Sequence, residues 1–221
     1  MYLVAQCWDD GNVSDLRIME LCRKYGAKAT FNITPGRYQK QVRTLARTWE
    51  GFDIWRFSLN EIASVYEDFP LASHTMTHPH PTQIPPEVFR REALDARKYI
   101  EDLRQCEARG FAWPFGEYNQ TCVEILREEG FVYGRTCANT DRVVPCEEPL
   151  AAATSTHWLN PDFELRLKKA KESGVFYFWG HSYEMKDDPR LWARYEEILP
   201  VLSSDPEAVW VDVMELFQKR S

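Results

Sequence analysis

Short apolar runs alternate with helix-like segments along most of this 221-residue chain. The pattern predicts strands at 2–7, 27–33, 69–73, 111–113, 131–136, 175–179 and 208–211, and helices at 14–25, 86–108, 119–129, 161–173, 189–203 and 212–219. Parallel strands need a long crossover between them, which is usually a helix. The alternation therefore favours an α/β fold, with a parallel sheet or barrel, in a single domain over residues 1–221.

Residues 37–68 interrupt that alternation. Helices are expected near 39–48 and 58–66, and several aromatic residues lie between them. The segment could form a lid or a substrate rim, but we favour a small satellite core under a long loop. Residues 137–160 are expected to be mainly loop.

Charge and cysteine content narrow the class of partner and the compartment. The net charge is −7 and no basic block is present, which argues against nucleic acid or an anionic membrane as a partner. No apolar run approaches the length of a membrane span, and no leader-like stretch precedes the first strand. The six cysteines form no C-x-x-C pair, so we expect reduced thiols and a cytoplasmic protein.

Three of the five histidines lie within residues 73–81. His74 and His78 are four residues apart, a spacing that places two imidazoles on one face of a helix or helix-like turn. Neutral imidazole is a common ligand for zinc and related ions. Pro79 and Pro81 prevent a helix from continuing, so we expect the pair at the mouth of the fold. The alternative is two solvated histidines in a proline-rich loop.

Two carboxylates follow the first predicted strand, in the sequence Asp9-Asp10-Gly11. One interpretation is a turn in which an aspartate caps the next helix. The other is a site in which one aspartate binds a metal ion and the other acts as a base. Ser14 is a competent cap for that helix, which favours the second interpretation.

Four motifs occur in order along the chain: Asp9-Asp10-Gly11, His74-Thr75-x-x-His78-Pro79, Phe111-Ala112-Trp113-Pro114-Phe115-Gly116 and Phe178-Trp179-Gly180-His181. Together they resemble the polysaccharide deacetylase family, which includes chitin and peptidoglycan deacetylases. The resemblance covers nearly the whole chain. It implies an irregular (β/α) barrel of about seven parallel strands, with the site at the carboxyl ends of the strands.

The resemblance also implies roles for individual side chains. Asp10, His74 and His78 would hold one divalent metal ion, with zinc the first expectation and cobalt, nickel or manganese as alternatives. Asp9 would act as the base that takes a proton from water. His181 would act as the acid that protonates the leaving amine.

Two further positions match the family's substrate contacts. The backbone N–H of Phe115 would donate to the oxyanion, and Trp179 would pack against the acetyl methyl group. Taken singly, both residues could be ordinary core residues, and His181 could be a buried histidine bonded to a carbonyl group. The order of the motifs along the chain favours the functional interpretation.

The sequence departs from the family at two places. Many members have arginine at the position of Ala112, where it orients the catalytic aspartate; Arg135 on the next predicted strand could reach the same place. The family's Asp-Trp motif, whose aspartate orients the acid histidine, has no clear match. Asp141 is the nearest candidate by order, and His157 and Glu184 are other possible partners.

Three functions are compatible with these patterns. The first is a metal-dependent hydrolase that removes acetyl groups from an N-acetylated sugar or oligosaccharide. The second is hydrolysis of another non-peptide C–N bond, such as that of a cyclic ureide or imide. The third is a catalytically silent glycan-binding module. The presence of Asp9 and His181 counts against the third, because a binding module has no use for an acid–base pair.

Overall fold

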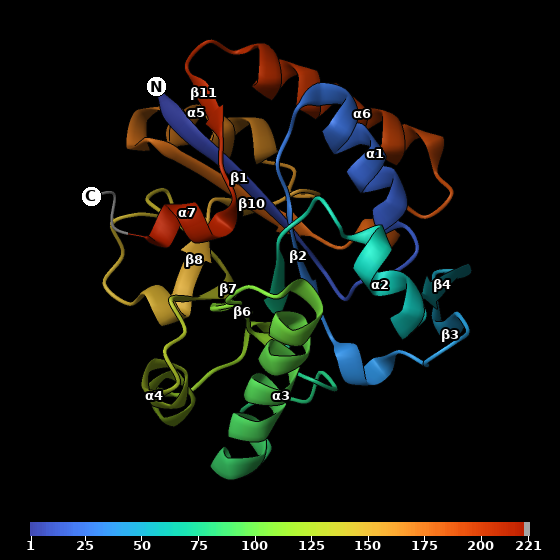
Figure 1. Cartoon of the computed structure of the whole chain (residues 1–221). Coiled ribbons are helices and arrows are strands. Elements are labelled where there is room, and N and C mark those ends of the chain that lie inside the picture. Colours follow the sequence, from blue (N-terminus) through green and yellow to red (C-terminus); the bar gives the residue numbers. More distant parts are fainter. Residues whose placement is uncertain (219–221) are drawn as a thin grey trace.

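Residues 1–218 are described by a computed structural model, and parallel strands form its centre (Figure 1). The strands are β1 (Tyr2–Asp9), β2 (Thr30–Ile33), β5 (Leu71–Ser73), β6 (Gly110–Ala112), β7 (Tyr133–Asn139), β8 (Ala152–Thr154), β9 (Thr156–His157), β10 (Val175–Gly180) and β11 (Ala208–Trp210). Their order is β8-β7-β6-β5-β2-β1-β10-β9, and β11 pairs with the first half of β1.

One stretch of chain closes this sheet into a barrel. Only Ser155 separates β8, which pairs with β7, from β9, which pairs with β10. The Ser155 N–H donates to the carbonyl oxygen of Tyr177 on β10, at 2.7 Å. With β8 and β9 counted as one interrupted strand, seven parallel strands enclose the barrel and β11 lies beside them. The irregular barrel expected from the sequence is confirmed.

The strands are buried on both faces, as is usual for parallel sheets. Every residue of β10 is buried, and so is nearly every residue of β1. Seven helices are described, and most of them cover the barrel: α1 (Asp15–Tyr25), α2 (Leu59–Val65), α3 (Pro86–Arg104), α4 (Gln120–Glu128), α5 (Phe163–Ser173), α6 (Pro189–Ser204) and α7 (Val213–Phe217). Helices α1 and α6 pack together on one flank, and α3 and α4 pack together on the opposite flank (Figure 1).

Packing around Gly180 fixes the end of β10. A Cβ atom at this glycine would lie 2.1 Å from Cδ1 of Trp158, whose ring is fully buried. Overpacking of this kind costs about 1–3 kcal/mol in a close-packed core. Glycine therefore allows the strand to approach the Trp158 ring just before the chain reaches His181.

The helix predicted at 39–48 is wrong. Residues Thr44–Trp49 form strand β3, which pairs antiparallel with β4 (Phe52–Arg56). The turn between them is Glu50-Gly51, with φ of 48° and 81°, and two successive positive φ angles are typical of the tight turns that join hairpin strands. A bridge between Asn12 and Arg56 attaches the hairpin to the loop after β1. Tertiary contacts and turn geometry thus override the helix propensity of this segment.

The remaining elements lie close to their predicted positions. Helix α2 begins with the capping box of Ser58 and Glu61, as is usual for a sequence of this type. Residues 137–160 contain β8 and β9 in addition to loop. The last predicted helix reaches residue 219, which lies outside the described residues. All six cysteines are free thiols, and none of the helices in residues 1–218 is long and apolar enough to cross a membrane.

Candidate active site

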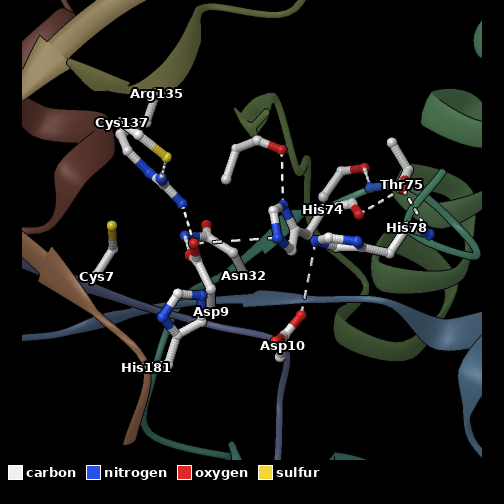
Figure 2. Close-up of polar contacts among 12 residues, drawn as sticks. Cys7, Asp9, Asp10, Asn32, His74, Thr75, His78, Arg135, Cys137 and His181 are labelled. Atoms are coloured by element: carbon white, nitrogen blue, oxygen red, sulfur yellow. Dashed lines mark hydrogen bonds and ion pairs between the residues drawn. The ribbon is translucent and has the colours of Figure 1, made fainter. Parts of the chain in front are cut away.

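The carboxyl ends of the barrel strands open into a pocket of about 490 Å³. Asp9 ends β1, His74 follows β5, and His181 follows β10, so three strands deliver polar side chains to one place. The pocket is large enough for a sugar-sized ligand. Figure 2 shows the polar residues at its base.

Asp10, His74 and His78 point toward one another in this pocket (Figure 2). One potential ligand atom from each residue lies within 4.8 Å of the other two, and His78 Nε2 is 3.8 Å from Asp10 Oδ1. His74 Nδ1 lies 2.8 Å from the carbonyl oxygen of Ala112. A carbonyl oxygen only accepts hydrogen bonds, so Nδ1 carries the proton and Nε2 presents a lone pair to the pocket.

The donor set fits a divalent cation. Asp10 Oδ1 is buried, and no hydrogen-bond partner for it occurs among residues 1–218. A buried carboxylate oxygen without a partner is costly unless a cation neutralises it. Burial lowers the pKa of His74, and burial together with His74 lowers the pKa of His78 to about 3. Both imidazoles are therefore neutral at physiological pH, as metal ligation requires.

The two histidines are brought together by a tight turn rather than by a helix. Thr75 and His78 have φ angles of 63° and 60°, in the left-handed region. The Thr75 hydroxyl accepts a hydrogen bond from the His78 N–H at 3.0 Å and donates to the His74 carbonyl at 2.6 Å. Asp10 and Phe115 also have positive φ, so three of the seven such non-glycine residues in the described chain line the pocket, and Thr75 lies in the turn that carries His78. Unfavourable backbone conformations of this kind concentrate at functional sites.

Asp9 is held by two donors at the base of the pocket. Arg135, which is fully buried, donates to Asp9 Oδ2, and Asn32 Nδ2 donates to Asp9 Oδ1 at 2.7 Å. Burial alone would raise the pKa of Asp9, but the charge of Arg135, together with that of His181 and the hydrogen bond from Asn32, outweighs it and lowers the pKa well below its usual range. The carboxylate is therefore ionised at neutral pH.

The contact predicted between Arg135 and Asp9 is confirmed, and the strand register explains it. Ala112 on β6 and Arg135 on β7 are direct register partners. An arginine on β7 thus enters the barrel at the level of Ala112, one strand further round the sheet. Its guanidinium also lies 4.6 Å from the centre of the Trp179 ring.

Glu184, in the 3₁₀ turn η4 (Ser182–Met185), is the acidic partner of His181. Its Oε1 is 3.1 Å from His181 Nδ1, and its Oε2 is 3.2 Å from His157 Nε2. Oε2 also accepts a hydrogen bond from Trp158 Nε1 at 2.8 Å. Burial alone would lower the pKa of His181, but the hydrogen bond and charge of Glu184 raise it to about 9. His181 is therefore protonated at neutral pH.

His157, His181 and Glu184 are also close enough together to hold a metal ion. Their mutual distances of 3.1 and 3.2 Å are those of hydrogen bonds, which proton-bearing imidazoles make to a carboxylate. The cluster is therefore a charge-assisted hydrogen-bond network, unlike the partnerless oxygen of Asp10.

Two sequence-based expectations at this site are wrong. Asp141 is not the partner of His181: its exposed carboxylate pairs with Arg166 and Lys169 at 2.7 and 2.8 Å. The side-chain cap expected at Ser14 is not formed either, because Ser14 has helical backbone angles (φ −66°, ψ −17°) rather than the extended ones of a capping residue.

Phe115 and Trp179 both line the pocket. Phe115 is the second residue of the 3₁₀ turn η2 (Pro114–Gly116). The Gly116 N–H donates to the Trp113 carbonyl, whereas the N–H of Phe115, so near the start of the turn, has no acceptor within it. Its ring is half-exposed and stacks on His80, with centroids 3.7 Å apart. Trp179 is nearly buried, and its Nε1 has no partner among the described residues.

The sequence reasoning missed Asn32, although a signal for it was present. Asn32 is a polar residue inside the apolar strand β2, and it is almost fully buried. Buried polar side chains are hydrogen-bonded as a rule, so an amide at the end of a barrel strand indicates a partner in the site.

We predict that replacing Arg135 with methionine strongly destabilises the protein. The change leaves the Asp9 charge buried without a partner, a loss of about 3–5 kcal/mol in the free energy of unfolding. Urea denaturation followed by circular dichroism measures this loss. Adding Asp9→Asn should restore part of the stability, because both charges are then removed. A loss no greater than that of Arg91→Met, at an exposed position of α3, would contradict the prediction.

Comparison with known proteins agrees with this architecture. The family model described as polysaccharide deacetylase matches residues 2–134. The deacetylase PplD of Streptococcus pyogenes, solved in complex with acetate, is 24% identical with a TM-score of 0.50, over 60% of this chain and 55% of that one. An acetyl xylan esterase from Clostridium thermocellum, solved with a cobalt ion, is 18% identical with a TM-score of 0.61, over 97% of this chain and 90% of that one.

A CE4 family pseudoenzyme from Bacillus anthracis is 14% identical, with a TM-score of 0.63, over 98% of this chain and 66% of that one. No curated protein sequence matches the chain. At these identities the structural similarities show the fold alone. The family model covers more than half of the sequence, and the chain therefore belongs to the polysaccharide deacetylase family.

Proposed function

We propose that this protein is a metal-dependent hydrolase that removes acetyl groups from an N-acetylated sugar or oligosaccharide. The proposal rests on one observation, which is the set of side chains that line a single pocket. A cation-binding donor set lies beside an ionised carboxylate, Asp9, and a protonated imidazole, His181. A pseudoenzyme shares this fold, so the residues of the pocket, and not the fold, support catalysis.

Asp10, His74 and His78 would hold one divalent cation. One carboxylate and two imidazoles suit zinc, and cobalt, nickel and manganese accept the same donors. When bound, such an ion supplies Lewis-acid polarisation of the scissile carbonyl group and eases the loss of a proton from water.

Asp9 would accept the proton of the attacking water. Its hydrogen bonds to Arg135 and Asn32 hold the carboxylate in one orientation and keep it ionised. A fixed, ionised acceptor is what general-base catalysis requires, because the proton must be taken while the new bond forms. Arg135 would thus act as a positioning residue for Asp9.

His181 would donate the proton that the leaving amine needs. A pKa near 9 keeps the imidazole charged at neutral pH, and Glu184 fixes the orientation of the ring. The Phe115 N–H would stabilise the developing oxyanion, and Trp179 would form the wall for the acetyl methyl group.

The other two functions are less well supported. Hydrolysis of a cyclic ureide or imide would use the same groups, and only substrate screening separates it from deacetylation. A glycan-binding module has no need of a buried Arg135–Asp9 pair or of a cationic His181, both of which carry a desolvation cost. Acetate release from N-acetylated oligosaccharides, assayed with added zinc, cobalt, nickel or manganese, tests the proposal directly.

We predict that His78→Ala abolishes stoichiometric binding of a divalent metal and leaves the fold intact. Removing one of three ligands leaves an incomplete donor set. Metal content after zinc loading and dialysis, measured by mass spectrometry, gives the result. His80→Ala is the matched control, because His80 is nearby but bonds to Glu117 outside the donor set. Equal metal content in the two variants would remove the metal site from the proposal.

We predict that Asp9 and His181 differ in their substrate dependence. Asp9→Asn should slow hydrolysis of both an N-acetyl sugar and an aryl acetate by about 10²–10⁴-fold, because both reactions need an activated water. His181→Ala should slow only the N-acetyl sugar by that amount, since an aryl oxide leaves without a proton. Equal losses on the two substrates in His181→Ala would exclude the acid role.

We predict that Glu184→Gln moves the alkaline limit of activity to lower pH. His181 must be protonated to act, and Glu184 is the main group that raises its pKa to about 9. Other titratable groups face His181 from β1 and from neighbouring loops: Asp9, Asp10, His157 and Tyr183. Burial lowers the pKa of His181, whereas its acidic neighbours raise it. Without the charge of Glu184 the pKa falls, so the imidazole loses its proton at a lower pH.

The pH dependence of kcat/KM measures this shift, which should be roughly one unit or more. Glu117→Gln is the control, because Glu117 bonds to His80 and Thr82 rather than to His181. An unchanged alkaline limit in Glu184→Gln would show that Glu184 does not set the charge of His181.

A further inference from the structure

Three arginines line the outer part of the pocket and have no acidic partner. They come from separate elements: Arg37 from the 3₁₀ turn η1 (Pro35–Arg37), Arg47 from β3 and Arg56 from β4. Within residues 1–218, no carboxylate oxygen lies within 4.0 Å of their side-chain nitrogens. The hairpin β3–β4 therefore forms part of the pocket rim. The less favoured of the two interpretations of residues 37–68, a substrate rim rather than a satellite core, describes it better.

Other cations near the β3–β4 hairpin, which do not line the pocket, have acidic partners. Arg43, just before β3, pairs with Glu61 at 2.6 Å, and Lys186 pairs with Glu50 in the hairpin turn. The whole chain carries a net charge of −7. The protein has many carboxylates, so a shortage of them does not explain why the three pocket arginines lack an acidic partner.

The backbone positions of Arg56 and Arg37 are fixed by contacts to the loop after β1, and the side chain of Arg47 makes contacts of its own. The backbone of Arg56 is bridged to Asn12, two residues after Asp10. Arg47 donates from Nη2 to the Tyr183 hydroxyl at 2.7 Å and lies 5.1 Å from the centre of that ring. The guanidinium group of Arg47, which these contacts hold in place, loses less entropy on binding a ligand than a freely moving one.

Arg37 is anchored through its neighbour in the chain. Tyr38 is buried, and its hydroxyl donates to the backbone carbonyl of Asp10 at 3.2 Å. This contact places the η1 turn beside the proposed metal ligands.

The three charges also act on one another. Burial lowers the pKa of Arg56, and Arg37 and Arg47 lower it further by repulsion, against the opposing charge of Asp10. An anionic ligand between them would relieve that repulsion. Guanidinium groups bind carboxylate and phosphate oxygens with two parallel hydrogen bonds, whereas a neutral glycan makes no use of three positive charges.

We propose that the substrate carries an anionic group, a carboxylate or a phosphate, which binds to Arg37, Arg47 and Arg56. The proposal rests on the proposed function for the reaction itself and adds the chemical class of the substrate. Arg47 contacts Tyr183, whose ring lies 4.9 Å from the ring of the proposed acid His181. The anionic group therefore belongs to the part of the substrate that bears the leaving amine.

The first test measures binding without catalysis. Isothermal titration calorimetry compares three sugars that differ at one carbon: glucose, glucuronate and glucose 6-phosphate. The zinc-loaded protein should bind at least one of the anionic sugars roughly tenfold or more tighter than glucose. Preference for glucuronate identifies a carboxylate site, and preference for glucose 6-phosphate identifies a phosphate site.

Variants decide whether the arginines cause that preference. Arg47→Gln and Arg56→Gln should each remove most of it, and Arg47→Lys should keep part of it because the charge remains. Arg91→Gln, on exposed α3, changes the net charge equally but lies outside the pocket, so it should bind like the wild type. Equal affinity for all three sugars, or a preference that survives the double Arg47→Gln/Arg56→Gln change, overturns the proposal. An anionic sugar that binds only to the zinc ion would keep its preference in the double variant, so that variant separates metal binding from arginine binding.

A second measurement separates this proposal from the proposed function. Acetate release is compared for N-acetylglucosamine, its 6-phosphate and its C6-carboxylate. Faster release from an anionic substrate, lost in Arg56→Gln, supports both proposals. Release that is equally fast from all three substrates supports deacetylation and overturns the anionic substrate. Arginine-dependent anion binding without release from any substrate supports the anion site and contradicts deacetylation.

Discussion

The site depends on the buried pair of Asp9 and Arg135 inside the barrel. Both side chains are almost fully excluded from solvent, so each charge would be strongly unfavourable without the other. The pair links β1 to β7 across the barrel interior and holds Asp9 ionised beside His74. A buried ion pair is weak support for stability, because apolar residues of similar size often serve as well. A position with these constraints is better explained by the need for an oriented carboxylate than by the need for a stable core.

Charge is arranged in layers from the base of the pocket to its rim. Asp9 and Asp10 lie at the base; Asp9 is bonded to Arg135, whereas Asp10 Oδ1 accepts no hydrogen bond within residues 1–218 and is available to the proposed metal ion. The rim carries the unpaired arginines of η1 and the β3–β4 hairpin. A ligand that satisfies both layers must present a polar carbonyl group to the base and a negative group to the rim. The two proposals thus describe one substrate, and they depend on different side chains.

The sequence predicted those features that follow from periodicity and from order along the chain. The parallel sheet or barrel built from alternating strands and helices is of this kind. The barrel of about seven strands and the ligand set of Asp10, His74 and His78 follow instead from the resemblance of four ordered motifs to the family. The reach of Arg135 follows from its place one strand after Ala112, where many family members have arginine. The β3–β4 hairpin was missed because its turn and its bridge to Asn12 outweigh local propensity. The short strands β8 and β9 have three and two residues, too few for a periodic signal. The order of motifs along the chain points to Asp141 as the partner of His181. The partner of a side chain depends on loop geometry, however, and motif order carries no information about that geometry.

Glu184 illustrates how packing decides a chemical property that the sequence alone could not assign. The Trp158 ring packs against Gly180, where no larger residue fits, and its Nε1 donates to Glu184. One buried ring therefore fixes both the strand end that carries His181 and the carboxylate that raises the pKa of His181. The family places an aspartate from another motif in this role, whereas here the partner follows His181 by three residues, in the same short turn. Glu184 is joined to His181 by the capping box of η4, so the group that raises the pKa of His181 most belongs to its own turn. The charges of Asp10 and Asp9 add to the effect, so the protonation state of the proposed acid is set mainly by Glu184 and secondarily by the two carboxylates that follow β1.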